Sequence, residues 1–121
     1  MGPVMVVEDD EDIRTGIAEV LRDEGYAVVE AKDGAEGLER VDAGDVPALI
    51  LVDLTMPRVS GPEFVRAVRD RSRLAQVPIV LLTGALDSQR YVQELGVAGC
   101  LGKPFSLGAL LDVVAKESRS T

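Results

Sequence analysis

The chain of 121 residues contains no histidine, no tryptophan and a single cysteine, and these absences exclude several classes of function. Without histidine there is no Ser-His-Asp or Cys-His nucleophile and no His-ligated metal site, so any metal must be bound by oxygen. One cysteine cannot form an internal disulfide, which favours a reducing compartment. Neither a signal peptide nor an apolar run of membrane-spanning length is recognisable. We therefore expect a cytoplasmic protein that does not associate with membranes.

Positive charge is also scarce, because 13 Lys and Arg against 21 Asp and Glu leave a net charge of -8. Nucleic-acid binding depends on clustered cations, so we expect no direct nucleic-acid partner. An apolar fraction of 46% is too high for a disordered chain. The length suits one domain, which we assign to residues 1–121, with a core over about 4–116 and a polar tail over 117–121.

Short apolar, β-branched runs alternate with segments of helical spacing along the whole chain. The runs predict strands at 4–7, 27–29, 48–52, 78–82 and 97–101. In the first helical segment Ile13, Ile17 and Leu21 share one face, and Gly25 stands where that helix would end. Later helices are predicted at 35–43, 62–71, 87–95 and 106–116. Such alternation implies right-handed βαβ crossovers and a parallel sheet covered by helices on both faces.

Polar residues stand where these apolar strands end. In an open parallel sheet the binding crevice lies at the carboxyl ends of the strands. Glu8 and Asp9 follow the first strand, Asp53 the third, Thr83 the fourth and Lys103 the fifth. Three carboxylates, a hydroxyl and an ammonium group are thus predicted to converge at one edge. An aspartate that closes a buried run is costly unless it reaches solvent or a cation, although an ordinary loop-start aspartate is the alternative.

The segment "VVEDDEDI" (6–13) places five acids directly behind the first strand. A nucleotide-binding domain would carry a glycine-rich loop here, to bring backbone N–H groups to a phosphate. Two carboxylates about 5 Å apart at an effective dielectric near 20 repel by roughly 3 kcal/mol, so three together favour a hard cation such as Mg²⁺ or Mn²⁺. The alternative for residues 10–12 is a helix start, where acids cap free N–H groups. We therefore divide the run into a metal site at Glu8 and Asp9 and a helix start.

Over about residues 4–116 the chain resembles the receiver domain of two-component response regulators. The resemblance rests on four motifs in the family's order, each at an expected strand end: "VVEDDEDIR" (6–14), "LVDLTMPRVSG" (51–61), "LLTG" (81–84) and "GKPF" (102–105). It implies a doubly wound, flavodoxin-like (βα)5 three-layer sandwich whose five-stranded parallel sheet has the order 2-1-3-4-5. It also implies a signalling switch that catalyses only its own phosphorylation and slow dephosphorylation.

The resemblance assigns the phosphoryl chemistry to Asp53, Thr83 and Lys103. Asp53 would accept a phosphoryl group from the phosphohistidine of a sensor histidine kinase or phosphotransfer protein. Thr83 and Lys103 would contact the phosphoryl oxygens, and the Lys103–Pro104 bond would be cis. A carboxylate is already ionised at neutral pH and needs no general base, which agrees with the lack of histidine. The donor must therefore be another protein, and a downstream protein or output domain would read the switch.

The metal site implied by the resemblance consists of Glu8, Asp9, Asp53 and the backbone carbonyl of Thr55. Asp9 and Asp53 would hold Mg²⁺ directly, and Glu8 through water. Enzymes that hydrolyse phosphate through an aspartyl intermediate generally use a second aspartate, two residues beyond the nucleophile, as acid and base. Here that position is Thr55, which argues against such an enzyme. Neither Thr55 nor Ala85 can act as a general base for a hydrolytic water, so the phosphoryl group is predicted to be long-lived.

Two features depart from the family pattern. Cys100 stands where the family usually carries Tyr or Phe, and the segment 83–96 is about two residues shorter than usual by our alignment. We expect a short or irregular fourth helix and signalling without the usual coupling of threonine to an aromatic ring. Cys100 is interpreted as a small buried apolar residue, with a redox sensor as the alternative. For Tyr91 we expect a surface position on the fourth helix, with replacement of the missing ring as the alternative. A receiver-like binding module that acts without phosphorylation is the competing function.

Overall fold

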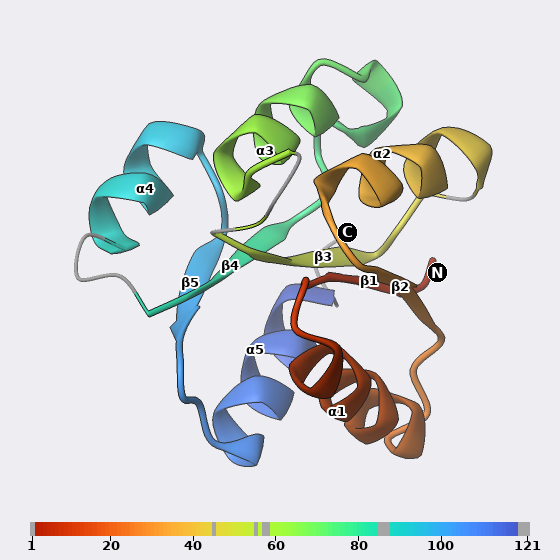
Figure 1. The fold of residues 1–121 in the computed structure, drawn as a ribbon, viewed down its shortest axis with the longest axis vertical. Coiled ribbons are helices and arrows are strands. Elements are labelled where there is room, and N and C mark those ends of the chain that lie inside the picture. Colours follow the sequence, from red (N-terminus) through yellow and green to blue (C-terminus); the bar gives the residue numbers. More distant parts are fainter. Residues whose placement is uncertain (1, 45, 55, 57–58, 85–87, 119–121) are drawn as a thin grey trace.

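The protein is represented by a computed structural model that describes residues 2–44, 46–54, 56, 59–84 and 88–118. Five parallel strands form one sheet in the order β2-β1-β3-β4-β5, which confirms the predicted topology (Figure 1). The strands are β1 (Val4–Val7), β2 (Val28–Ala31), β3 (Leu49–Asp53), β4 (Ile79–Thr83) and β5 (Gly99–Gly102). The helices are α1 (Glu11–Asp23), α2 (Gly34–Ala43), α3 (Gly61–Arg69), α4 (Ser88–Leu95) and α5 (Leu107–Ser118), with a 3-10 turn η1 (Ser72–Leu74).

The sheet is the middle layer of a three-layer sandwich. In Figure 1, α2, α3 and α4 lie on one face of the sheet and α1 and α5 on the other. Alternate residues of each central strand enter two separate cores: Met5 and Ile50 pack under α2 and α3, whereas Val4 and Leu49 pack against α1 and α5. Because the central strands β1, β3 and β4 are buried on both faces, they are apolar up to their last residue, which produced the recognisable runs in the sequence.

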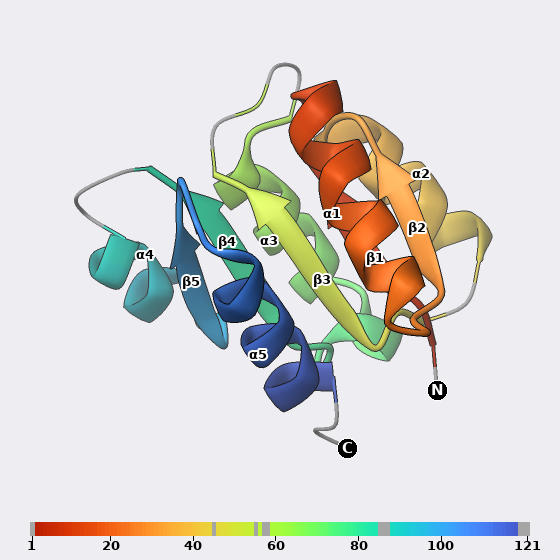
Figure 2. The same ribbon diagram turned by 90° about the horizontal axis from the view of Figure 1, so that it is seen from below.

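The strand register brings the functional strand ends to one edge. Val7 pairs with Val52, Val52 with Leu81, and Thr83 with Gly102, so β1, β3, β4 and β5 end at nearly the same level. Figure 2, which looks from the side of α1 and α5, shows β3 in the space between these two helices, with β4 and β5 next to it in the sheet. The residues that follow these strands therefore share one crevice.

The acids after β1 divide as the sequence predicts. Asp10 is the N-cap of α1, where its Oδ1 accepts a hydrogen bond of 3.0 Å from the Ile13 backbone N–H, and Glu11 and Asp12 form the first turn. Negative side chains are favoured there by the helix dipole. At the other end of α1, Gly25 has φ of +95°, a left-handed conformation that glycine adopts without strain.

Two predicted helix ends were wrong. The third helix ends at Arg69 instead of residue 71, because Arg71 is extended and its side chain holds Asp42 of α2 at 2.6 Å. The chain then forms η1, which turns Leu74 into the core. The last helix continues two residues beyond the predicted end, to Ser118, which is buried.

The fourth helix is short, as expected, with eight residues from Ser88. Residue 87, where we predicted it to start, lies outside the described part. Among the helices of the described residues, none combines the length and the apolar character needed to cross a lipid bilayer.

Candidate functional site

Three carboxylates meet at the carboxyl edge of the sheet. Glu8 and Asp9 directly follow β1, and Asp53 is the last residue of its neighbour β3. One carboxylate oxygen of each lies within 4.8 Å of the other two. Glu8 is completely buried and Asp53 is 7% exposed, whereas Asp9 is open to solvent. The predicted convergence of these acids is therefore present in the structure.

Lys103 joins two of the acids. Its Nζ lies 2.5 Å from Oε1 of Glu8 and 3.3 Å from Oδ1 of Asp53. Its backbone N–H donates to the Thr83 carbonyl at 2.8 Å, and the Lys103–Pro104 peptide bond is cis, as the resemblance implies. Lys103 is therefore attached to β4 through its backbone and to the acids through its side chain.

Burial sets the protonation of this cluster. Burial first, and then the nearby Asp53 carboxylate, raise the pKa of Glu8, while Lys103 lowers it, and the balance of the three brings this pKa from 4.5 to about 7. Partial burial acts to lower the pKa of Lys103, but the hydrogen bond to Glu8 and the negative charges outweigh it and hold this pKa above its usual value. Lys103 therefore stays charged at neutral pH, while Glu8 is poised between its two protonation states.

The donor set fits a hard divalent cation. Oε2 of Glu8 is buried and has no hydrogen-bond partner among the described residues, so one ligand-capable oxygen is desolvated without compensation. Three carboxylates with one ammonium leave an excess of negative charge that a divalent ion would neutralise. Thr55, the fourth ligand implied by the resemblance, lies outside the described residues, as does Ala85.

Thr83 is the last residue of β4 and is buried at the same edge. It is one position beyond Leu82, which pairs with Asp53. This register places a hydroxyl-bearing residue on the strand next to the Asp53 strand. The structure thus brings Thr83, Asp53 and Lys103 to one crevice from three different strand ends.

The structure also places Cys100 and Tyr91, the two residues considered for the missing aromatic ring. Cys100 is half-buried in β5 and packs against the core beneath α2, α3 and α4, with Nε2 of Gln89 4.0 Å from its sulfur. Tyr91 is not a surface residue as favoured above: it is half-buried and packs against the same core. The Arg90 guanidinium lies 5.5 Å from the centre of the tyrosine ring.

Sequence reasoning missed the close packing around Gly61. A Cβ atom on Gly61 would lie 2.6 Å from the Asp53 carbonyl oxygen and 2.7 Å from Cα of Leu54. Only glycine allows α3 to begin this close to the strand end that carries Asp53. Gly61 closes the motif "LVDLTMPRVSG", and its spacing from Asp53 was the signal that could have identified it.

The fold and the site define a doubly wound α/β protein with an acidic crevice at the carboxyl edge of its sheet. The family model of the response regulator receiver domain matches residues 4–115, and the chain belongs to this family. Receiver domains are signalling modules. Response regulator RR06 of Streptococcus pneumoniae is 39% identical over 111 residues, which cover 89% of this chain and 49% of RR06.

Two solved structures extend this similarity to three dimensions. The chemotaxis protein CheY4 of Vibrio cholerae is 34% identical, with a TM-score of 0.89, 97% of this chain covered and 98% of CheY4. The response regulator TrrA of Thermotoga maritima, solved in complex with Mg²⁺ and BeF, is 28% identical, with a TM-score of 0.83, 96% of this chain covered and 98% of TrrA. The chain spans between 7% and 54% of the length of eight curated relatives, RR06 among them.

Proposed function

We propose that the chain is one phosphoacceptor domain in which Asp53 takes a phosphoryl group from a protein phosphohistidine in a Mg²⁺-dependent reaction. The observation that carries this proposal is the contact of the half-buried Lys103 with the buried Glu8 and Asp53, beside the exposed Asp9. Its excess negative charge and the uncompensated Glu8 oxygen are compatible with a divalent ion. The complex of TrrA with Mg²⁺ and BeF supports the same reading.

In this mechanism Asp53 is the nucleophile. One of its oxygens attacks phosphorus, the P–N bond breaks, and the donor ring, protonated on its other nitrogen, leaves as neutral imidazole. Lys103, already 3.3 Å from Asp53, neutralises charge on the transferred group, and the Thr83 hydroxyl donates to it. Glu8, Asp9, Asp53 and the carbonyl of Thr55 would hold Mg²⁺, which supplies further charge neutralisation when bound.

The donor must reach Asp53 from outside, because the chain has no histidine. An apolar cleft of about 570 Å³ lies between α1 and α5, lined among others by Ile13, Ile17, Phe105 and Leu107. Lys103 lines the same cleft, which makes the cleft continuous with the crevice. We therefore propose that the histidine kinase or phosphotransfer protein docks over this cleft with apolar side chains beside its phosphohistidine.

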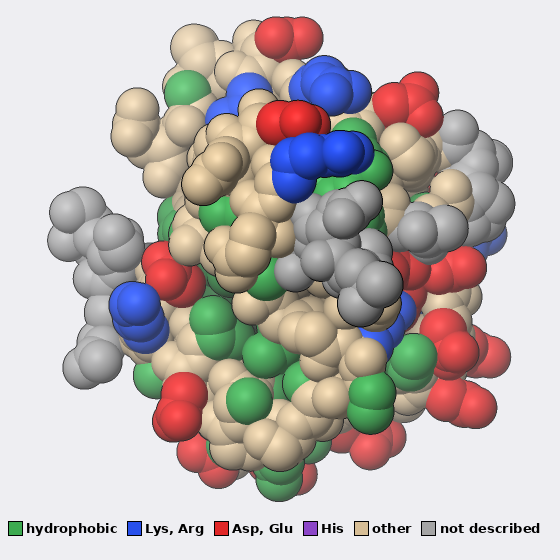
Figure 3. All heavy atoms as spheres, turned by 90° about the vertical axis from the view of Figure 1, so that its left-hand side faces the viewer, with side chains coloured by type: hydrophobic (Ala, Val, Ile, Leu, Met, Phe, Trp, Pro, Cys, Tyr) green, Lys and Arg blue, Asp and Glu red, His purple; other side chains and the backbone are tan. Residues whose placement is uncertain are grey.

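The phosphorylated state would be read by a downstream protein or output domain. We place this contact on the side of the molecule that carries α4 and β5, where apolar side chains lie between charged ones (Figure 3). Cys100 and Tyr91 pack beneath this side, so a change at Asp53 would be transmitted without the usual ring of the fifth strand.

The decisive experiment is incubation with a small-molecule acyl phosphate, with Mg²⁺ or with EDTA, read by intact mass. We expect a gain of one phosphoryl group that requires Mg²⁺ and is lost in Asp53→Asn and Asp9→Asn. Glu11→Gln is the matched control, because Glu11 is an acid of the same run but belongs to the first turn of α1. An equal gain in Asp53→Asn would refute the proposal, and no gain in any condition would favour the module that acts without phosphorylation.

A further inference from the structure

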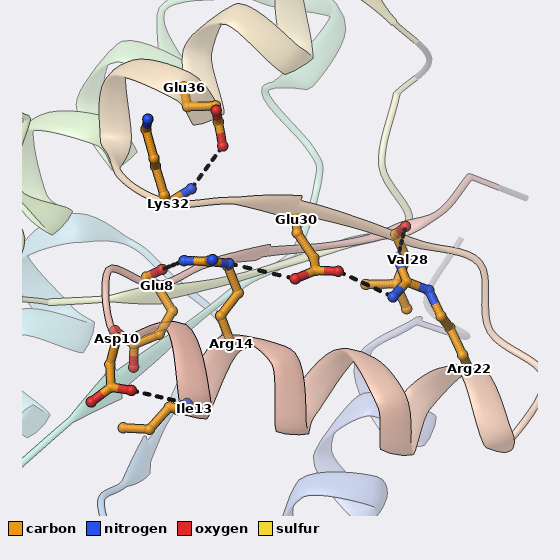
Figure 4. Close-up of polar contacts among 9 residues, drawn as sticks. All are labelled: Glu8, Asp10, Ile13, Arg14, Arg22, Val28, Glu30, Lys32 and Glu36. Atoms are coloured by element: carbon orange, nitrogen blue, oxygen red, sulfur yellow. Dashed lines mark hydrogen bonds and ion pairs between the residues drawn. The ribbon is translucent and has the colours of Figure 1, made fainter.

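Arg14, on α1, connects the acidic crevice to the edge strand β2 (Figure 4). Its Nη1 donates to the backbone carbonyl of Glu8 at 2.9 Å, and its Nε lies 3.4 Å from Oε1 of Glu30. The other Glu30 oxygen accepts from Arg22 at 3.1 Å. Glu30 thus bridges two arginines of one helix, but only Arg14 reaches a residue of the crevice.

The Glu8 carbonyl needs a donor from outside the sheet. The Glu8 N–H still donates to the Ala31 carbonyl at 3.0 Å, but the register of β1 and β2 ends one residue earlier, at Val7 and Ala31. A backbone carbonyl in a buried position is costly without a partner. The Arg14 side chain, only 15% exposed, provides a charge-assisted hydrogen bond at this point.

This bond determines the direction in which Asp9 leaves the strand. The Glu8 carbonyl and the Asp9 N–H belong to one planar peptide group, so holding the oxygen also fixes the plane from which the Asp9 side chain departs. On its other side the turn is held by Asp10, which caps α1 and whose carbonyl accepts from the Arg14 N–H at 2.9 Å. Arg14 therefore contacts both ends of the three-residue connection, 8–10, between β1 and α1.

We infer that Arg14 is a positioning residue for the cation site: its guanidinium, oriented by Glu30, holds the Glu8–Asp9 peptide so that both carboxylates face Asp53. This inference rests on the proposed function. A positioning role and a purely electrostatic role of Arg14 predict opposite changes in cation affinity when Arg14 is removed. Removing a positive charge near the acids would tighten cation binding, whereas releasing the peptide would weaken it.

The test is the affinity for Mg²⁺ itself, measured by isothermal titration calorimetry without phosphodonor. For Arg14→Met we expect a dissociation constant about tenfold higher, the lower end of the effect of losing an orienting partner of a metal ligand. Arg22→Met is the matched control, because it removes the same charge from the same Glu30 carboxylate and also a carbonyl hydrogen bond, to Val28. Its affinity should stay within twofold of the wild type.

Two further variants test the positioning role of Arg14 independently of Arg14→Met. Arg14→Lys keeps the charge but cannot reach the Glu8 carbonyl and Glu30 together, so its affinity should also fall. Glu30→Gln keeps both arginines but weakens the contact that orients the Arg14 guanidinium. Its loss of Mg²⁺ affinity should therefore be smaller than that of Arg14→Met. If Arg14→Met fails to fold, these two variants decide.

The outcomes separate this inference from the proposed function. Tighter or unchanged Mg²⁺ binding in Arg14→Met, or full affinity in Arg14→Lys, would overturn the positioning role while leaving the phosphoacceptor proposal intact. An equal loss in Arg22→Met would overturn it as well, since the effect would then follow the ion-pair network and not the Glu8 contact. A wild-type chain that binds no Mg²⁺ would overturn the proposed function.

Discussion

Replacing Lys103 by methionine removes the cation that, among the described residues, is paired with the carboxylates of Glu8 and Asp53. At an effective dielectric of about 20, an ammonium 2.5 Å from one carboxylate and 3.3 Å from another gains roughly 5 to 7 kcal/mol of Coulomb energy with each. Desolvation cancels much of this, and loss of one partner of a buried pair typically costs about 3–5 kcal/mol. The lysine side chain is 24% exposed, so we lower the expected loss to about 1–3 kcal/mol at pH 8.

The loss of unfolding free energy in Lys103→Met should increase as the pH rises. The pKa of Glu8 is raised from 4.5 to about 7, so between these values the native state binds more protons than the unfolded state and stability falls as pH rises. Without Lys103 this pKa rises further, and the fall continues to higher pH. Each additional proton changes the free energy of unfolding by at most about 1.4 kcal/mol per pH unit. The variant should therefore lose least at pH 6, where Glu8 is mostly protonated and the contact with Asp53 is the main one removed, and lose most at pH 8.5.

The assay is urea unfolding in EDTA, followed by far-ultraviolet circular dichroism because the chain has no tryptophan. Lys32→Met is the control, since Lys32 is an exposed lysine that follows β2 at the same edge of the sheet. Its free energy of unfolding should change little with pH relative to the wild type. A loss in Lys103→Met that is independent of pH, or larger at pH 6 than at pH 8.5, would refute the coupling of Lys103 to Glu8.

Three further outcomes are expected. Gly61→Ala should destabilise the protein by about 1–3 kcal/mol in urea unfolding, because its Cβ would lie 2.6 Å from the carbonyl oxygen of Asp53. Gly16→Ala is the control and should be neutral or stabilising, because nothing lies within 4 Å of its added Cβ. Equal effects of the two substitutions would contradict the packing argument. Leu107 is 56% exposed and lines the apolar cleft, so Leu107→Glu should slow phosphotransfer from a protein donor at least tenfold and leave acyl-phosphate labelling unchanged. Equal slowing of both reactions would refute docking of the donor over the cleft. The phosphoryl group should persist well beyond seconds by mass, since neither Thr55 nor Ala85 offers a base; a half-life of seconds would contradict this.

The sequence predicted the fold well because each level of the pattern pointed the same way. Strands buried on both faces are apolar throughout, so their ends could be located within about two residues, and Asp53 emerged as the acid that closes one of them. The division after Asp9 followed from helix-capping chemistry and is confirmed by the Asp10 cap. These features depend on local sequence, which a single chain displays completely.

What the sequence could not show depends on contacts between distant segments. Arg14 reads as one more surface charge on a helix, and only the register of β1 against β2 reveals an uncovered carbonyl within its reach. The end of α3 was misplaced because the chain leaves the helix and forms η1, which places Leu74 in the core among residues from distant segments. Tyr91 was assigned to the surface because α4 has only eight residues, too few for the apolar pattern to indicate which face of the helix is buried.

The arrangement of charge links the resting site to its proposed chemistry. In the resting structure Lys103 is closer to Glu8 than to Asp53, at 2.5 Å against 3.3 Å, so the buried acid competes with the nucleophile for the same cation. A divalent ion on Glu8 and Asp9 would weaken that competition, because a neutralised Glu8 attracts an ammonium less strongly. Lys103 would then be released toward the oxygens of a phosphoryl group on Asp53. Under the proposed function, cation binding and phosphoryl transfer would therefore be coupled through Lys103, and the buried Glu8, whose ionised form is disfavoured by burial, would make this coupling strong.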